Sequence, residues 1–523
     1  MAVNLITVLL AIYLLCAAVE SASILAVFSS LSFTDHQVFR GYVSLLSQRG
    51  HSVVVMTPYP GHFQLPDSER IVEISVAEDS LPFWEEYRKL ITNTDDFYPR
   101  MRALNNFSIK LATAQLRSKQ MTALLINPNI KFDLVITEAD VPVLYAVAEK
   151  YKAPHIAITT SSGKIHQYES KGSPIHPILY PDVNTLNYRN ASSWQKLVEI
   201  NRHLQTRYEY YNNYLPACEA VVKNIFNLKK DLLEIEQDID MLFVAANPAL
   251  IGNRPSGPAI AYVDRMHIKP GYLLPENLKN LLDSASQGAV YFSLGAIQES
   301  EHLSPKVLQT LTDAFKELPF TVLWKIGNIT MINKPENVYA QGWFPQQEIL
   351  AHPNVKAFIT HGGARSLEEA LFYGVPIVGL PVIRSRKPFI QEITKYGAGQ
   401  ILDFYYLEKE AVKSVLTTVV KNESYKKAIL NLKSLVEEPI LSGPDNAVWW
   451  TEYVLRNGGA RHLRSDAVGV TFVKYYLLDM ISFLLAIVFI LLTVTFHILR
   501  YIVKRLRIRF LNYREQGGKF KAL

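Results

Sequence analysis

The stretch FITHGGARSLEEALFYGVPIVGLP, Phe358 to Pro381, decides the fold of this 523-residue chain. The apolar run at 356–360 predicts a buried strand, and the pattern after the glycine pair predicts a helix of about two turns. Gly374 lies where a left-handed C-cap would end that helix, and Pro376 prevents it from resuming. A second apolar strand follows directly. The stretch therefore predicts a βαβ unit with glycines at the strand-to-helix turn.

That turn suits an anionic ligand. Gly362 and Gly363 lack a Cβ atom, so a ligand can approach the backbone closely. The N–H groups of the first helical turn have no partners within the helix, and the helix dipole is positive there. His361 adds a donor, and Glu369 lies close enough to receive ribose hydroxyls. We predict a phosphate site, although a glycine pair is also typical of a plain turn.

A second block, NVYAQGWFPQQEILAHPN at residues 337–354, makes the signal specific. With both blocks the chain resembles the animal microsomal UDP-glycosyltransferases, from about residue 25 to residue 490. The resemblance implies that Trp343 stacks on uracil, Gln346 bonds the base edge and Glu369 binds ribose. It also implies that the diphosphate is held by His361 and the glycine pair. The predicted UDP-sugar site comprises Ser293, Gly295, Trp343, Gln346, His361, Gly363, Arg365, Ser366, Glu369, Ser385 and Arg386.

The resemblance also implies the fold. It is an α/β fold of the GT-B type, with two facing doubly wound Rossmann-like domains, a cleft between them and one C-terminal transmembrane helix. The strand–helix–strand pattern at 23–57 agrees with such a sheet. The predicted organisation is a signal peptide (1–22), an N-terminal acceptor-binding domain (23–246), a linker (247–287), a C-terminal UDP-sugar-binding domain with a return helix (288–460), a juxtamembrane segment (461–479), a transmembrane helix (480–499) and a basic cytosolic tail (500–523).

The C-terminal region predicts a single membrane span. Residues 480–499 carry no formal charge, and such a helix is about 30 Å long, the thickness of a bilayer core. The tail from residue 500 holds eight Lys or Arg and one Glu, which accounts for the whole net charge of +6. We therefore expect no nucleic-acid surface on the body. The positive-inside rule predicts a type I orientation with a cytosolic tail. The resemblance to microsomal enzymes implies the membrane of the endoplasmic reticulum, with the domains in its lumen.

Other features agree with that location but leave alternatives open. The apolar segment near the N-terminus lacks a preceding Lys or Arg, so a retained anchor competes with a signal peptide. Four glycosylation sequons occur, although a chain of this length contains some by chance. The predicted sequon positions are Asn106, Asn190, Asn328 and Asn422. The expected partners are a UDP-sugar, a small lipophilic acceptor and the membrane, with a homodimer left open.

The family reaction is an inverting displacement of UDP by an acceptor hydroxyl, with the UDP-sugar as co-substrate and no metal or other cofactor. It requires a His base and a carboxylate that orients it. Glu138 matches the carboxylate position. The position of the family His falls on Asp35 when it is counted back without a gap from Phe39, and His36 comes one residue later. We prefer His36 as the base, with Asp35 or the loss of a working dyad as the alternatives.

The sugar-binding positions also depart from the family. Ser385 and Arg386 stand where the family has Asp-Gln, and Ala296 stands where it usually has Ser or Thr. The leading hypothesis is a transferase that moves a hexose, expected to be glucose, to a hydroxyl of a lipophilic compound held by helices in residues 80–130. The alternative is a catalytically impaired relative that binds a nucleotide or a lipophilic ligand.

Overall fold

The computed structural model describes residues 21–62, 70–92, 97–180, 192–269, 271, 273–295, 303–327, 334–383, 386–437 and 441–519. The chain divides into two units, Met1–Ser465 and Asp466–Leu523. The predicted signal peptide lies outside the described residues, apart from its last two.

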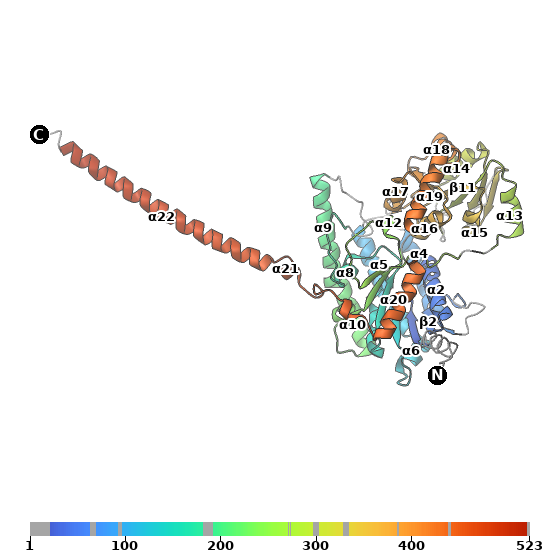
Figure 1. Cartoon of the computed structure of the whole chain (residues 1–523), viewed down its shortest axis with the longest axis horizontal. Coiled ribbons are helices and arrows are strands. Elements are labelled where there is room, and N and C mark those ends of the chain that lie inside the picture. Colours follow the sequence, from blue (N-terminus) through green and yellow to red (C-terminus); the bar gives the residue numbers. More distant parts are fainter. Residues whose placement is uncertain are drawn as a thin grey trace, which may run out of the picture. The chain divides into compact units, whose positions relative to one another are not determined.

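The first unit contains two fully parallel sheets (Figure 1). The first sheet has the order β3-β2-β1-β4-β5-β6-β7. Its strands are β1 (Ser23–Val27), β2 (Ser52–Thr57), β3 (Ile71–Ser75), β4 (Leu134–Glu138), β5 (His155–Thr159), β6 (Met241–Val244) and β7 (Ile260–Tyr262). Parallel strands are buried on both faces, which explains their continuous apolar runs.

The second sheet has the order β10-β9-β8-β11-β12-β13. Its strands are β8 (Ala289–Ser293), β9 (Thr321–Lys325), β10 (Val338–Gln341), β11 (Val355–Thr360), β12 (Ile377–Gly379) and β13 (Gly399–Ile401). The predicted βαβ unit is β11, α16 (Ala364–Tyr373) and β12, and Gly374 adopts the predicted left-handed C-cap with φ of 64°. Two doubly wound α/β domains of the GT-B type are therefore confirmed.

Helices cover both faces of each sheet. On the first sheet, α2 (Phe33–Gln48) packs on one face, and α5 (Phe97–Leu116), α6 (Lys119–Ile126), α7 (Ala146–Tyr151) and α10 (Leu215–Phe226) pack on the other. The remaining helices of the first domain are α3 (Ala77–Ser80), α4 (Trp84–Thr92), α8 (Ile165–Glu169), α9 (Ser193–Glu209) and α11 (Leu232–Asp238). The second domain adds α13 (Glu276–Asp283), α14 (Pro305–Lys316), α15 (Gln346–Ala351), α17 (Lys387–Thr394), α18 (Lys409–Lys421) and α19 (Glu423–Glu437).

Short regular elements interrupt the stretch predicted as a linker, residues 247–287. It contains α12 (Pro248–Ile251), strand β7 and α13. Because β7 pairs with β6, the first sheet extends beyond residue 246 to Tyr262. The proline and glycine residues that favoured a linker here border these short elements.

The helix α20 (Gly443–Asn457) returns to the first domain, where it packs against α2 and β7 (Figure 1). Tyr42 and Thr451 share a hydrogen bond of 2.6 Å between their hydroxyl groups. Arg49 Nε donates to Glu452 Oε1 at 2.7 Å. The end of the second domain therefore fixes the helix that follows β1.

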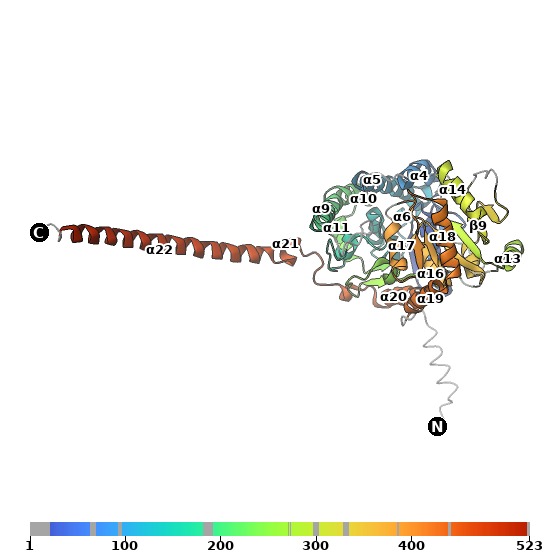
Figure 2. The ribbon, with the colours of Figure 1, turned by 90° about the horizontal axis from the view of Figure 1, so that it is seen from above.

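In the second unit, α21 (Phe472–Tyr475) precedes one long helix, α22 (Leu478–Lys519), which Figure 2 shows as an unbroken coil. Among the described helices, its segment Leu478–Arg514 is the one long and apolar enough to cross a membrane. The predicted span at 480–499 lies within this segment.

We predict that Gly41→Ala destabilises the first unit. An ideal Cβ on Gly41 would lie 1.8 Å from the carbonyl oxygen of Met266, and a backbone atom cannot rotate away. The free energy of unfolding should fall by at least about 2 kcal/mol, measured as a lower Tm. Gly257→Ala is the matched control, because a Cβ there has no atom within 4 Å. Equal Tm values for the two variants would contradict this account of the packing.

Candidate active site

The order of the first sheet creates a crevice at the carboxyl ends of its strands. Strand β1 lies between β2 and β4, so the connections leave in opposite directions from β1 and β4. Ligands of open parallel sheets bind at such a switch point. Asp35 lies in the first turn of α2, shortly after β1, and Glu138 is the last residue of β4. The fold therefore brings the two predicted carboxylates to the same crevice.

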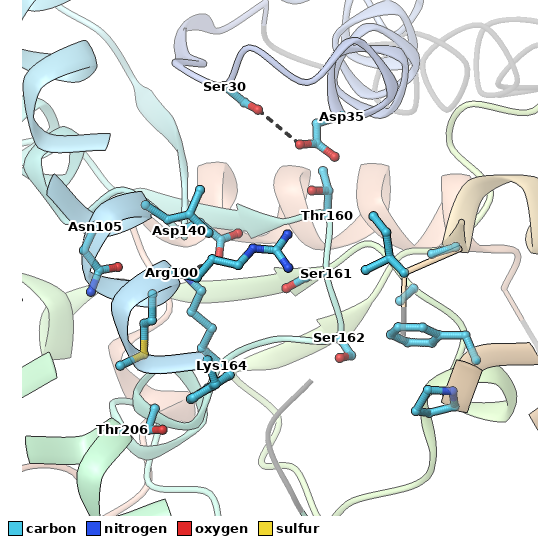
Figure 3. A pocket seen from close by; sticks show the side chains of 18 of the residues that line it. Ser30, Asp35, Arg100, Asn105, Asp140, Thr160, Ser161, Ser162, Lys164 and Thr206 are labelled. Carbon is cyan, nitrogen blue, oxygen red and sulfur yellow. Dashed lines mark hydrogen bonds and ion pairs between the residues drawn. The ribbon is translucent and has the colours of Figure 1, made fainter. Parts of the chain in front are cut away.

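The loop after β1 connects these carboxylates. Glu138 Oε2 accepts the backbone N–H groups of Ser29 at 2.6 Å and Ser30 at 2.9 Å. The hydroxyl of Ser30 then donates to Asp35 Oδ2 at 3.1 Å, as Figure 3 shows. Ser30 thus positions both groups, although no motif in the sequence pointed to this residue.

Burial changes the acidity of both groups. It raises the pKa of Asp35, and hydrogen bonds from Thr160 and Ser32 together with the charge of Arg365 oppose this shift. Burial, together with the negative charge of Asp35, raises the pKa of Glu138 to about 8, although the N–H groups of Ser29 and Ser30 oppose this shift. At neutral pH the pair therefore carries less charge than two separate carboxylates would.

His36 occupies a different place from the one we preferred for it. Its side chain is fully buried, and its ring packs edge-on against Tyr59 with centroids 4.8 Å apart. Nε2 lies 2.7 Å from the carbonyl oxygen of Ser30, and Nδ1 lies 3.4 Å from Thr57 Oγ1. Burial lowers the pKa of His36 to about 3. His36 is directed into the core, so Asp35, the alternative base, is the residue that lines the cavity.

A cavity of about 1750 Å³ lies in front of these carboxylates (Figure 3). Both domains line it. The first domain contributes Ser30, Asp35, Glu138, Asp140, Thr160 and Ser161, and the second contributes Ala364, Arg365, Pro381, Ile383, Pro388 and Phe389. Helix α5 adds the apolar side chains of Met101, Leu104, Phe107 and Leu111, within the region expected to hold a lipophilic acceptor.

The second sheet has a corresponding switch point, between β8 and β11. The loops after these strands place Gly295 and Gly363 against the ring of His361. A Cβ on Gly363 would lie 2.6 Å from His361 Nε2, and one on Gly295 would lie 3.1 Å from Cε1. Ser293, also predicted here, accepts the backbone N–H of Gly295 through its hydroxyl at 3.3 Å. Only glycines leave room for the imidazole at this turn.

His361 itself is poised for a ligand. It is 5% exposed, and among the described residues its Nδ1 has no hydrogen-bond partner. The ring precedes α16, whose first-turn N–H groups favour an anion. The predicted phosphate site therefore combines an unused imidazole nitrogen with a helix N-terminus.

Three predicted nucleoside-binding residues form one hydrogen-bonded group. Gln346 Nε2 donates to Glu369 Oε2 and, at 3.2 Å, to Ser366 Oγ. Gln347, which the sequence analysis did not select, donates to Glu369 Oε1 at 3.1 Å. Burial raises the pKa of Glu369 to about 7. Gln347 could have been predicted as part of this site, because it directly follows Gln346 in the sequence after Phe344.

Trp343 lies at the end of this group and is 58% exposed. Lys325 Nζ is 4.4 Å from its ring centroid, and the ring of Phe33 lies edge-on at 6.4 Å. Phe33 begins α2 of the first domain, so both domains contribute to the surroundings of this indole.

Arg365 differs from its predicted role as a phosphate ligand. Its Nη2 donates to the carbonyl oxygens of Thr160 at 2.7 Å and Ala245 at 2.6 Å, both in the first domain. Its Nη1 donates to Glu368 Oε2 at 2.7 Å. The guanidinium therefore connects α16 to the carboxyl ends of β5 and β6 instead of extending into the phosphate site.

The residues at the sugar-binding positions are only partly described. Arg386 occupies the N-cap position of α17, and its backbone N–H donates to the carbonyl oxygen of Ile383 at 3.0 Å. Ser385 and Ala296 lie outside the described residues.

Comparison with known proteins places these features in a family. The model described as "UDP-glucoronosyl and UDP-glucosyl transferase" matches residues 25–509. UDP-glycosyltransferase UGT5 of Dactylopius coccus is 30% identical over 489 residues, covering 89% of this chain and 89% of the relative. An ecdysteroid UDP-glucosyltransferase of Spodoptera littoralis nuclear polyhedrosis virus is 29% identical over 490 residues, covering 89% and 94%.

Among solved structures, the spinosyn forosaminyltransferase SpnP has a TM-score of 0.58 and 16% identity, covering 84% of this chain and 100% of that one. The calicheamicin glycosyltransferase CalG4 has a TM-score of 0.57 and 18% identity, covering 84% and 99%. At this level of identity the likeness shows the fold, which is that of GT-B glycosyltransferases.

The pKa of Glu138 predicts a pH-dependent stability. The folded chain keeps this proton up to about pH 8, whereas a free Glu releases it near pH 4.5. The contribution of Glu138 to the free energy of unfolding is therefore fully present below pH 4.5 and decreases as the pH rises to 8. Glu138→Gln removes the titration and keeps an oxygen for the N–H of Ser29. Between pH 5 and pH 8 the wild type should lose this contribution and the variant should not. The Tm of Glu138→Gln minus the Tm of the wild type should therefore increase over this range.

The exposed carboxylate Glu85, whose side chain is 65% exposed, supplies the control. Glu85→Gln should give a Tm difference that stays level with pH, and a level difference for Glu138→Gln would refute the raised pKa.

Arg365 predicts a second change in stability. Arg365→Met leaves Glu368 and two carbonyl oxygens without their donor, and loss of one partner of a buried ion pair costs about 3 kcal/mol or more. Arg365→Lys keeps the charge but cannot reach three acceptors with one ammonium group, so it should recover only part of the lost Tm. A Tm for Arg365→Met equal to the wild-type value would show that this connection is not stabilising.

Proposed function

Since this chain belongs to the UDP-glucuronosyl and UDP-glucosyl transferase family, we propose that it transfers a hexose from a UDP-sugar to a hydroxyl group of a small lipophilic acceptor. The reaction is a single inverting displacement. Glucose is the proposed sugar, because the viral and scale-insect relatives include proteins named UDP-glucosyltransferase. The observation that carries the proposal is the pair Asp35 and Glu138, both facing a cavity that the two domains share.

Asp35 is the proposed general base. It takes the proton of the acceptor hydroxyl while the oxygen attacks the anomeric carbon and the bond from that carbon to the UDP oxygen breaks. A carboxylate with an ordinary pKa is a weak base, and a pKa raised by burial brings it closer to the operating pH. Glu138, whose pKa is about 8, stays largely protonated beside it. The neutral Glu138 spares Asp35 the repulsion of a second negative charge.

The charge that develops on UDP is met at the other switch point. His361, with its unpartnered Nδ1 among the described residues, and the N-terminus of α16 are the proposed groups. Preorganised donors of this kind stabilise a leaving group without reorganisation. Trp343, Gln346, Ser366 and Glu369 are proposed to hold uridine. The proposed reaction uses no metal and no cofactor besides the co-substrate.

The proposed location is the membrane of the endoplasmic reticulum, with α22 as a single span. Its charge-free segment is followed by the basic tail, which the positive-inside rule assigns to the cytosol. This orientation gives the catalytic unit a lumenal position.

The second candidate is a binding protein for nucleotides or lipophilic compounds, without turnover. One observation favours it: the imidazole of His36 lies in the core, so the cavity has no His at the position of the family base. Under this proposal UDP would raise the Tm, and no donor would be consumed.

Asp35→Asn separates the two candidates. Loss of a general base typically lowers a rate by about 10²- to 10⁴-fold, so kcat for UDP release from UDP-glucose with a phenolic acceptor should fall by that factor. The rise in Tm with UDP should persist, because Asp35 lies at the other switch point. Asp403→Asn is the control, as Asp403 is an exposed carboxylate that also lines the cavity.

Unchanged kcat in Asp35→Asn would remove Asp35 from the mechanism. A wild-type protein that binds UDP and releases none from any donor would establish the binding function instead.

A further inference from the structure

The cavity contains more basic side chains than its acidic groups neutralise. Six described Lys or Arg residues line it, from both domains. Four of them pair with carboxylates: Lys164 with Asp140 at 3.2 Å, Arg202 with Glu199 at 3.2 Å, Arg365 with Glu368 at 2.7 Å, and Arg207 with Glu169. The other two are Arg100 and Lys387. Within the described ranges neither has a carboxylate at ion-pair distance.

Arg100 is directed into the cavity, where Figure 3 shows its guanidinium extended. It lies in the first turn of α5, and its Nη2 donates to the carbonyl of Ile91 at a long distance of 3.4 Å. Its Nε is shielded from solvent and has no hydrogen-bond partner among the described residues. A shielded guanidinium nitrogen without an acceptor is unfavourable. A planar ligand carboxylate would supply the missing acceptors in a bidentate pair.

The second domain adds a further positive charge to the lining of the cavity. Lys387 is the first residue of α17, whose N-terminus is itself partly positive. Burial and the positive charge of Arg386, the residue before Lys387, lower the pKa of Arg100. The guanidinium of Arg100 nevertheless stays charged at neutral pH. The repulsion is relieved when an anion lies between the two domains.

The acidic residues of the cavity do not cancel this charge. Asp140 is paired with Lys164, and Asp403 is exposed to solvent and forms no ion pair with a described residue. Burial raises the pKa of Glu138 to about 8 and also raises that of Asp35, so these two groups carry a reduced negative charge at neutral pH. The unpaired positive charge is therefore available to a ligand.

We propose that Arg100 and Lys387 form a subsite for a carboxylate carried by the acceptor. This inference rests on the proposed function and refines it: the acceptors are lipophilic hydroxy acids. The apolar residues next to Arg100 on α5, Met101 and Leu104, line the same cavity and suit a hydrocarbon body. Because Arg100 belongs to this acceptor wall, the carboxylate is assigned to the acceptor and not to the sugar.

The test uses two acceptors that differ only in charge, 3-(4-hydroxyphenyl)propionic acid and its methyl ester, with UDP-glucose and the full-length protein. The wild type should have a higher kcat/KM for the acid. Arg100→Gln should lower kcat/KM for the acid by about 10- to 100-fold, the usual effect of losing a charge-assisted pair. The ester should change by less than about twofold in the same variant. Lys387→Gln should also affect the acid selectively.

Arg117→Gln is the matched control, because Arg117 is an exposed Arg directly after the same helix and away from the cavity. It should leave both acceptors unchanged. An unchanged rise in Tm with UDP checks that Arg100→Gln is folded.

Several results would overturn the subsite. Equal losses for acid and ester would make Arg100 a structural residue. A loss that appears with UDP-glucuronate and not with UDP-glucose, on the ester, would assign the carboxylate to the donor. If the wild type turns over neither compound, the proposed function fails, and the subsite is then tested by calorimetry of acceptor binding. Equal affinities of the wild type for acid and ester would overturn the subsite. Weaker binding of the acid alone in Arg100→Gln would support it.

Discussion

The guanidinium of Arg365 joins the two sheets at their carboxyl edges, and the shared cavity depends on this connection. Arg365 lies in the first turn of α16, where a strand-to-helix turn presents N–H groups to a ligand. Its bonds to Thr160 and Ala245 hold that turn against the ends of β5 and β6. The start of α16 therefore lies beside the ends of these strands, where Ala364 and Arg365 line the same cavity as Asp35.

The return of α20 fixes the opposite end of the same arrangement. Helix α2 carries Asp35 in its first turn, and α20 holds its later turns through Tyr42 and Arg49. The residues of α20 that receive these bonds come from the end of the second domain. The position of the helix that carries Asp35 thus depends on α20, which lies some four hundred residues later in the chain. The carboxylate of Asp35 is held locally, by the hydroxyl of Ser30.

The sequence predicts features that depend on neighbours in the chain and misses those that depend on distant ones. The βαβ unit, its left-handed cap at Gly374 and the grouping of Gln346 with Glu369 follow from local patterns and from the resemblance. The contacts of Arg365 could not be predicted, since their partners lie 120 and 205 positions away. The burial of His36 could have been predicted in principle. His36, Phe39 and Val43 follow the spacing of one buried helix face, so the register of α2 directs His36 to the core and its neighbour elsewhere.

That register bears on the proposal that Asp35 stands where the family has a His. A His at this position would be oriented by a charged carboxylate partner. An Asp needs an uncharged partner instead, because two charged carboxylates in one buried crevice repel each other. Burial supplies the difference: it raises the pKa of Glu138 to about 8, so this group can remain protonated while Asp35 ionises. The hydroxyl of Ser30 and the charge of Arg365 then favour the ionised form of Asp35. Under the proposal that Asp35 is the base, the replacement of the His changes which member of the pair carries the charge, and one carboxylate able to accept a proton remains at the cavity.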